Sequence, residues 1–440
     1  FLAKGTEAAA KKVIDAKGCY VFPGIIDCHA HLNEPGFEYR EDFETGSRAA
    51  VVAGCTCLID MPLNNDPSLM NKEIFDLKMG RISKHSAVDF ALWGGIVGDY
   101  DSQPGSVKNN MDDLVDLHHC GVAAFKGFTC PNGDLFPTVN MGNVRKALEI
   151  LKPYNALCGF HCEEFGQVLE REKEAKAKEG RTNDEKIRDF LDSHDVWTEY
   201  VATKNVIDMA RATGGRVHIC HVSHPMVAQV VKDAIHEGLK ITAETCPHYL
   251  LLDDHLYDLP DFEGAKYVCA PPLRKPRDND VLWRALANRE IQTVSTDHCS
   301  FTLTQKAFGR EDFTKIPGGL PGVETRGEVV YTIAASENKL SLAGVCRALS
   351  ENPAKLYGLF PRKGVIAAGS DADIVVYDPG ASHVLRGAEL LSKAGYTPFE
   401  GFRTNGGIAK VYLRGSLQVD GGKVIGGKMG KYLKRGKCAL

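Results

Sequence analysis

Eight short apolar segments alternate with longer amphipathic segments along most of this 440-residue chain, and that alternation constrains its fold more than any other feature. The apolar segments, which have the length of buried strands, are Tyr20–Ile26, Thr56–Met61, Phe90–Gly95, Ala123–Phe128, Leu157–His161, Arg216–His221, Lys240–Thr245 and Ile291–Thr296. Helical patterns lie between them, at Met111–His119, Asn143–Leu151, Val196–Ala212 and Met226–Glu237. Because strands that alternate with helices form parallel sheets, the sequence predicts an α/β fold with a TIM-like (β/α)8 barrel.

The two ends of the chain follow a different pattern. After Lys363, the stretches GVIAAGSDADIVVYDP and AKVYLRGSLQVDGGKVI carry the Gly and Asp turns that are typical of β-hairpins. We expect a small β-sandwich domain built from both chain ends. We expect residues 1–22 to form its N-terminal part, which looks truncated, residues 23–362 to form the barrel, and residues 363–440 to form its C-terminal part and a basic, solvated tail.

Composition excludes several classes of partner. The formal net charge is −4, so no basic excess favours binding to nucleic acid or to an anionic membrane. No apolar run reaches the ~18 residues of a transmembrane helix, and the segment FLAKGTEAAAKK does not have the apolar core of a signal peptide. The 14 cysteines do not follow the short spacing of a disulfide framework. We therefore expect a cytoplasmic protein with reduced thiols.

Two histidines follow the first apolar segment, in the sequence GIIDCHAHLNEPG. In a barrel of this kind, functional groups project from the carboxyl ends of the strands. Because His29 and His31 are two residues apart, their side chains point to the same face of an extended strand. Two neighbouring imidazoles can hold one metal ion. The pattern His-x-His alone is also common in structural roles, so its weight depends on the other strand ends.

Lys126 ends the apolar segment GVAAFKGF. A buried, unpaired lysine is rare because burial opposes its charge. One interpretation is a side chain that extends to the surface. The other is a neutral amine that reacts with carbon dioxide, so that the resulting carbamate, an N6-carboxylysine, bridges two metal ions.

Three more strand ends carry ligand chemistry. His161 and His221 each close an apolar segment, and Asp297 follows the last one. Each could be structural by itself, but a carboxylate beside bound metal also accepts a proton from water. Together the six residues predict a site for two divalent ions about 3.5–4 Å apart, which activates a water molecule. The predicted ligands are His29, His31, Lys126, His161, His221 and Asp297.

This ordered set resembles the amidohydrolase superfamily, in particular its cyclic amidohydrolase branch of allantoinases, hydantoinases, dihydropyrimidinases and dihydroorotases. The resemblance implies that His29 and His31 bind the first metal and that Lys126 is the carbamylated bridge. It also implies that His161 and His221 bind the second metal, and that Asp297 binds the first and is the general base. Two zinc ions and a homotetramer are further implications of the resemblance.

Different segments resemble different members of the branch. HAHLNEPG, EDFETGSRAAVVAGCTCLIDMPLN and ETCPHYLLLD look like allantoinase, and Asn33 stands where dihydroorotases carry an Arg that grips a carboxylate. FEGAKYVCAPPLRK and later segments look like D-hydantoinase and dihydropyrimidinase. Those enzymes, however, usually have Tyr at the position of Pro131, Ser at that of Ala270 and Asn at that of Gly319.

The favoured function is hydrolysis of the ring amide of a hydantoin-type cyclic ureide, allantoin to allantoate. The first alternative is a hydantoinase or dihydropyrimidinase that acts on 5-substituted hydantoins or dihydropyrimidines. The second is a non-catalytic scaffold of the same fold, which the presence of all six ligand types disfavours. The predicted substrate contacts are Asn33, Asn64, Ala270 and Gly319.

Overall fold

A computed structural model of the chain describes residues 13–98 and 109–440. Its main sheet is parallel, with the strand order β10-β2-β3-β4-β5-β6-β7-β8-β9. The two ends of this row, β9 and β10, are consecutive pieces of one strand: β9 pairs with β8, and β10 pairs with β2. The sheet therefore curls into the predicted barrel. Its strands are β2 (Ile25–His31), β3 (Cys55–Asp60), β4 (Asp89–Gly95), β5 (Ala124–Phe128), β6 (Leu157–His161), β7 (Arg216–Ile219), β8 (Ile241–Thr245), β9 (Thr293–Val294) and β10 (His298–Cys299).

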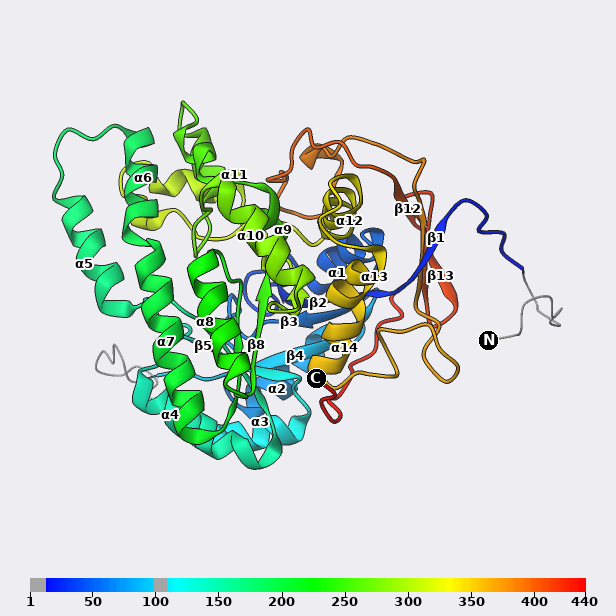
Figure 1. The fold of residues 1–440 in the computed structure, drawn as a ribbon, viewed down its shortest axis with the longest axis horizontal. Coiled ribbons are helices and arrows are strands. Elements are labelled where there is room, and N and C mark those ends of the chain that lie inside the picture. Colours follow the sequence, from blue (N-terminus) through cyan, green and yellow to red (C-terminus); the bar gives the residue numbers. More distant parts are fainter. Residues whose placement is uncertain (1–12, 99–108) are drawn as a thin grey trace.

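Helices cover the outside of the barrel (Figure 1). Two of them, α5 and α6, follow β6 and stand at the rim near the carboxyl ends of the strands. The described helices are α1 (Phe43–Val52), α2 (Lys72–Ile82), α3 (Leu114–Cys120), α4 (Met141–Leu151), α5 (Phe165–Lys176), α6 (Asn183–Ser193), α7 (Val196–Thr213), α8 (Pro225–His236), α9 (Pro247–Leu251), α10 (Pro276–Ala287), α11 (Leu303–Lys306), α12 (Arg326–Ser336), α13 (Leu342–Cys346) and α14 (Asn352–Leu356). None of them is long and apolar enough to cross a membrane.

The first predicted strand, Tyr20–Ile26, is wrong in its limits. The chain divides at Gly24, where an added Cβ would lie 2.1 Å from the Thr56 hydroxyl, so only glycine fits. Before that point β1 (Tyr20–Pro23) pairs antiparallel with β11 (Ile374–Asp378) in the second sheet. After it β2 enters the barrel, and His29 and His31 consequently belong to the strand itself.

Both ends of the chain contribute to the second sheet, as predicted. It is a five-stranded antiparallel sheet with the order β1-β11-β12-β13-β14, seen beside the barrel in Figure 1. The remaining strands are β12 (Gly407–Leu413), β13 (Ser416–Asp420) and β14 (Lys423–Val424). In the described part of the chain this domain has one sheet and not the two layers of a sandwich. Residues 1–12 lie outside the described residues, and the domain limits at residues 22 and 362 stay a prediction.

The C-terminal segment is bound to the barrel, in contrast to the predicted solvated tail. The Leu433 amide donates to the Phe90 carbonyl (2.7 Å), and Leu433 itself is buried. An Arg216 guanidinium nitrogen donates to the Leu440 carbonyl (3.0 Å). Phe90 and Arg216 stand at the starts of β4 and β7. The last residues therefore run across the face of the barrel opposite to the carboxyl ends of its strands.

Candidate metal centre

The carboxyl ends of β2, β6 and β7 bring four predicted histidines together. The ring centroids of His29 and His31 are 5.4 Å apart, those of His29 and His221 are 5.5 Å apart, and those of His161 and His221 are 4.6 Å apart. All four side chains are buried. Burial and the nearby Lys126 lower the pKa of His221 well below its ordinary value. His221 is therefore neutral, which is the form of imidazole that binds metal.

Asp297 lies beside two of these rings. Its Oδ1 is 3.0 Å from the Nε2 of His29 and 3.2 Å from the Nε2 of His31. Burial raises the pKa of the Asp297 carboxyl, but the neighbouring histidines outweigh that effect and hold this pKa well below its usual range. Ligand atoms of the three side chains lie within 4.8 Å of one another, so this group can hold a metal ion.

Lys126 is the most unusual member of the set. Its side chain is fully buried on β5, and its Nζ has no hydrogen-bond partner in the described structure. The Phe128 ring lies beneath it, with the centroid 4.9 Å from Nζ. A buried ammonium without a partner is unfavourable. A carbamylated amine that binds two cations would remove this orphaned group, so the residues present fit the predicted centre.

Two buried carboxylates, which the sequence analysis did not assign, hold the candidate ligands in place. Glu244 Oε1 is 2.5 Å from His29 Nδ1. Glu163 contacts both His161 Nε2 (2.6 Å) and His194 Nδ1 (2.8 Å). Carboxylates of this kind fix the orientation of metal-binding imidazoles. The available signal for Glu244 was its charge inside an otherwise uncharged strand, and for Glu163 its position two residues after His161.

Left-handed backbone is concentrated at this end of the barrel. Asn33, Asn64, His221 and Asp297 have φ values of 55°, 60°, 36° and 48°. Such conformations cost about 1–3 kcal/mol each in residues other than glycine, and they persist where the surroundings enforce them. At Asp297 the turn also separates β9 from β10. The predicted strand Ile291–Thr296 is shorter in the structure, where only Thr293–Val294 is strand.

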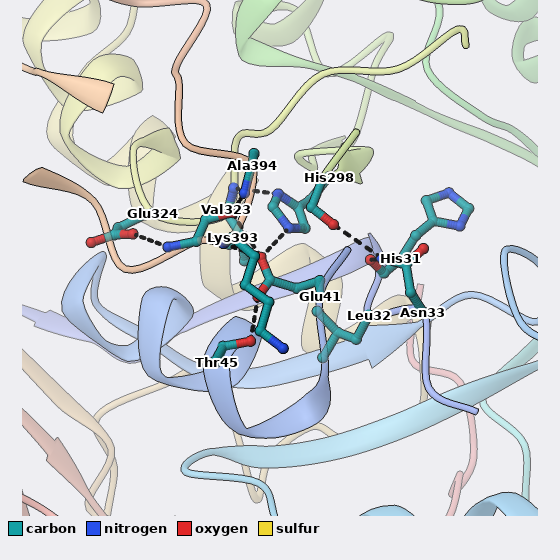
Figure 2. A network of polar contacts seen from close by, with 12 residues as sticks. His31, Leu32, Asn33, Glu41, Thr45, His298, Val323, Glu324, Lys393 and Ala394 are labelled. Carbon is teal, nitrogen blue, oxygen red and sulfur yellow. Dashed lines mark hydrogen bonds and ion pairs between the residues drawn. The ribbon is translucent and has the colours of Figure 1, made fainter. Parts of the chain in front are cut away.

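The residue after Asp297 is anchored away from the candidate ligands. Figure 2 shows the His298 ring directed toward Glu41 and the backbone of Val323, while His31 lies to the other side. The His298 Nδ1 accepts from the Gly322 amide (3.1 Å), and its Nε2 is 3.5 Å from a Glu41 oxygen. That same oxygen accepts from the Ser392 hydroxyl (2.7 Å). The segment that carries Asp297 is thus tied to a loop of the second domain.

A cavity of about 380 Å³ opens over the candidate ligands. Of the predicted substrate contacts, Asn64 and Ala270 line it, whereas Asn33 and Gly319 do not. The Asn33 amide instead donates to the His31 carbonyl and the Ser300 hydroxyl (both 3.1 Å). Pro131 lines the cavity at the position where D-hydantoinases are expected to carry Tyr. The remaining lining residues include Leu63, Phe128, Val168, Glu172, Phe190, His194, Phe301, Ile316 and Gly318.

One buried cation supports the part of the wall that contains Ala270 and Gly318. The Lys306 ammonium donates to the carbonyls of Val268 (2.6 Å), Pro317 (2.7 Å) and Gly319 (2.8 Å). These three bonds use all of its protons. Burial lowers the pKa of Lys306 to about 7. The sequence analysis gave this residue no role.

Comparisons with known proteins identify the family of this chain. The model of the amidohydrolase family matches residues 20–418. The D-hydantoinase of Geobacillus stearothermophilus is 34% identical over 445 residues, which cover 99% of this chain and 91% of that protein. The allantoinase of Deinococcus radiodurans is also 34% identical, over 97% of this chain and 90% of its own. The crystal structure of the dihydropyrimidinase from Brevibacillus agri superposes with a TM-score of 0.90 at 32% identity, over 99% of this chain and 92% of the other.

These matches extend over nearly the whole chain, and the named relatives are hydrolases of cyclic amides. The chain therefore belongs to the amidohydrolase family and is a cyclic amidohydrolase.

Proposed function

We propose that this enzyme hydrolyses the ring amide of a hydantoin-type cyclic ureide, with allantoin as its substrate and allantoate as its product. The observation that carries the proposal is the buried, unpartnered Lys126 amine on the same barrel rim as four histidines and Asp297. A barrel that processes sugars or phosphates does not require this combination of a buried lysine, four histidines and an aspartate. The combination is suited to two divalent cations, which we propose are zinc, held by His29, His31, Lys126 as N6-carboxylysine, His161, His221 and Asp297.

When bound, the two cations supply Lewis-acid polarisation of the ring carbonyl and lower the pKa of a water molecule. The protein supplies the proton transfer. Asp297 accepts the proton of the attacking water and donates it to the ring nitrogen that leaves. Glu244 keeps the His29 ring oriented through Nδ1. The backbone near Ala270 and Gly318 lies at the cavity wall, where it can bind the imide edge of the ring.

Hydrolysis of 5-substituted hydantoins or dihydropyrimidines is the second candidate. It is supported by the D-hydantoinase and dihydropyrimidinase relatives, which are as similar to this chain as the allantoinases are. Against it stands Pro131, which occupies the cavity wall without a hydroxyl group. A non-catalytic scaffold is disfavoured because every predicted ligand is present near the barrel rim, and five of the six are buried.

The first experiment compares allantoin, hydantoin, dihydrouracil and dihydroorotate as substrates of the metal-reconstituted protein. We expect allantoin to have the highest kcat/KM, by at least about tenfold, equivalent to about 1.4 kcal/mol. A preference for dihydrouracil or alkylated hydantoins would select the second candidate. Absence of turnover with metal bound would reject both.

The role of Asp297 has its own test. In Asp297→Asn we expect kcat to fall by roughly 100- to 10,000-fold while metal remains bound, because the amide cannot accept the proton. The surface variant Asp280→Asn, whose carboxylate pairs with Lys339, serves as the control and should retain full activity. Near-normal turnover by Asp297→Asn would exclude Asp297 as the general base.

Two further expectations accompany the proposal. All 14 cysteines are free thiols, which supports a location in the reducing cytoplasm. The resemblance to the family supports a homotetramer, and the mass of the protein in solution tests it.

A further inference from the structure

One side of the cavity is formed by the rim helices α5 and α6 and not by strand ends. His194 immediately follows α6, and its ring stacks on that of Phe190, with centroids 4.5 Å apart and an interplanar angle of 24°. Its Nδ1 contacts Glu163 (2.8 Å), the carboxylate that also contacts His161. Phe190 and Glu163 therefore fix the His194 ring on two sides. The Glu163 carboxylate lies between this ring and His161, a candidate metal ligand.

The other nitrogen of this ring faces the cavity. His194 Nε2 is 3.9 Å from Glu172 Oε1, which is too long for a direct hydrogen bond, and both side chains line the cavity. Glu163 on one side and Glu172 on the other place two carboxylates around one imidazole, an arrangement that favours a protonated ring. Nε2 then presents a donor, and Glu172 presents an acceptor beside it.

The surroundings restrict what can reach this pair. Val168, Phe190 and Ile316 line the same part of the cavity and contribute only apolar surface. Besides Thr314, the polar side chains that a ring bound over the metal ligands would meet on this side are His194 and Glu172, a donor and an acceptor next to each other. A ureido group has the complementary edge, since its carbonyl accepts a hydrogen bond and its N–H groups donate.

We propose that His194 and Glu172 are specificity-determining residues that bind the ureido arm of the substrate, with His194 Nε2–H donating to the arm carbonyl and the Glu172 carboxylate accepting from an arm N–H. This inference rests on the proposed function, because it assumes that the ring lies over the candidate metal centre. It goes further by assigning the arm to residues of α5 and α6. Neither residue was predicted from the sequence.

The test compares a substrate with the arm, allantoin, and one without it, hydantoin, in three variants: His194→Phe, His194→Gln and Glu172→Gln. Hydrogen bonds to charged groups are worth enough to change rates about 10- to 100-fold. We expect His194→Phe to lower kcat/KM for allantoin by that factor and to leave the value for hydantoin within about threefold. His194→Gln, which keeps a donor, should recover part of the loss, and Glu172→Gln should show a smaller loss of the same selectivity.

His255→Phe is the matched control, because His255 is an exposed histidine in the short 3-10 helix Asp254–Asp258 and does not line the cavity. Metal content is measured in each variant, since Glu163 joins His194 to His161. Equal losses on allantoin and hydantoin, or no loss on either, would overturn the inference.

A binding measurement separates this inference from the proposed function. Calorimetry on the slow variant Asp297→Asn gives affinities for allantoin and hydantoin without turnover. We expect His194→Phe, added to that variant, to weaken allantoin binding at least tenfold and hydantoin binding hardly at all. If allantoin does not bind, or binds equally well in both backgrounds, the arm site is rejected, whatever reaction the enzyme catalyses.

Discussion

The two walls of the cavity differ in how they are built. One wall consists of strand ends, where His29 and His161 are buried in the barrel rim and oriented by carboxylates. The other consists of α5, α6 and the segment 313–318, which carry His194, Glu172 and mainly apolar side chains. The first wall is positioned by neighbouring strands of one sheet. The second wall is positioned by packing between segments that connect the strands, such as α5 and α6.

This difference separates reaction from selectivity. The strand-end wall carries the six predicted metal ligands, each at or near the carboxyl end of a strand. The helical wall carries His194 and Glu172, which we propose bind the part of the substrate that does not react. Under that proposal, a change in the helical wall alters substrate preference and leaves the metal ligands in place.

The largest expected effect comes from Lys126→Met, which tests the strand-end wall. The variant cannot form a carbamate, so we expect fewer than two metal ions per chain and a loss of kcat of about 1,000-fold, or about 4 kcal/mol. Its metal-free form should be at least as stable toward urea as metal-free wild type, because the change removes an orphaned buried amine. Full metal content by mass spectrometry together with normal activity would contradict the assignment.

Glu244→Gln should have the next largest effect on the same wall. Loss of the carboxylate that orients His29 should weaken metal binding about 10- to 100-fold. Competition with a chelator measures this affinity. Glu237→Gln, an exposed carboxylate paired with Arg211, should leave it unchanged. An unaltered affinity in Glu244→Gln would mean that other contacts orient His29.

The helical wall is tested by the pH dependence of stability at Lys306, because this lysine binds the carbonyls of Pro317 and Gly319. Its pKa falls from 10.5 to about 7 in the folded chain, so between these values the folded state binds fewer protons than the unfolded state. The stability that this residue contributes is fully present above pH 10.5 and is lost as pH falls toward 7. From pH 7 to 9, the unfolding free energy of wild type should therefore rise relative to Lys306→Met by about 1–2 kcal/mol.

Urea titrations at several pH values provide this measurement. Lys315→Met, at an exposed neighbouring lysine, should show no such trend relative to wild type. A difference between wild type and Lys306→Met that shrinks with pH would mean that the three carbonyl contacts, and not burial, determine the charge of Lys306.

The smallest effect is expected at Asn33. Its amide holds the His31 carbonyl and Ser300, so Asn33→Ala should lower the unfolding free energy by about 1 kcal/mol and leave the KM for allantoin within about threefold. Asn33→Gly tolerates the φ of 55° and separates the loss of the amide from backbone strain. A tenfold rise in KM would instead support the substrate contact predicted from the sequence.

The barrel was predictable because its strands are buried apolar segments. Leu157–His161 was predicted with its observed limits, the segments corresponding to β4, β5 and β8 differ from the structure by one residue at one end, and the segment corresponding to β3 is shifted by one residue. Errors occurred where a single residue changes the backbone. Gly24 divides one predicted strand between two sheets, and the predicted strand that precedes the left-handed Asp297 is shortened to Thr293–Val294. The pattern of apolar and polar residues gives no signal for either of these changes in the backbone.

The predicted ligands converge because strand ends of a parallel barrel meet at one rim. The sequence around His194 gave no comparable signal. His194 follows a helix in the connection between β6 and β7, and it reaches the cavity only because α6 packs there. Glu163 could be interpreted equally well as a solvated residue after a strand. The positions of such residues depend on how the connecting segments pack against the barrel. Local sequence patterns do not predict that packing.

The bound C-terminal segment has a practical consequence. Because Leu433 and Leu440 are held against the starts of β4 and β7, the end of the chain lies on the face opposite to the cavity. A linker attached after Leu440 would tether the enzyme to a resin or an electrode with the cavity directed toward the bulk solution, so that immobilisation need not block the entry of substrate.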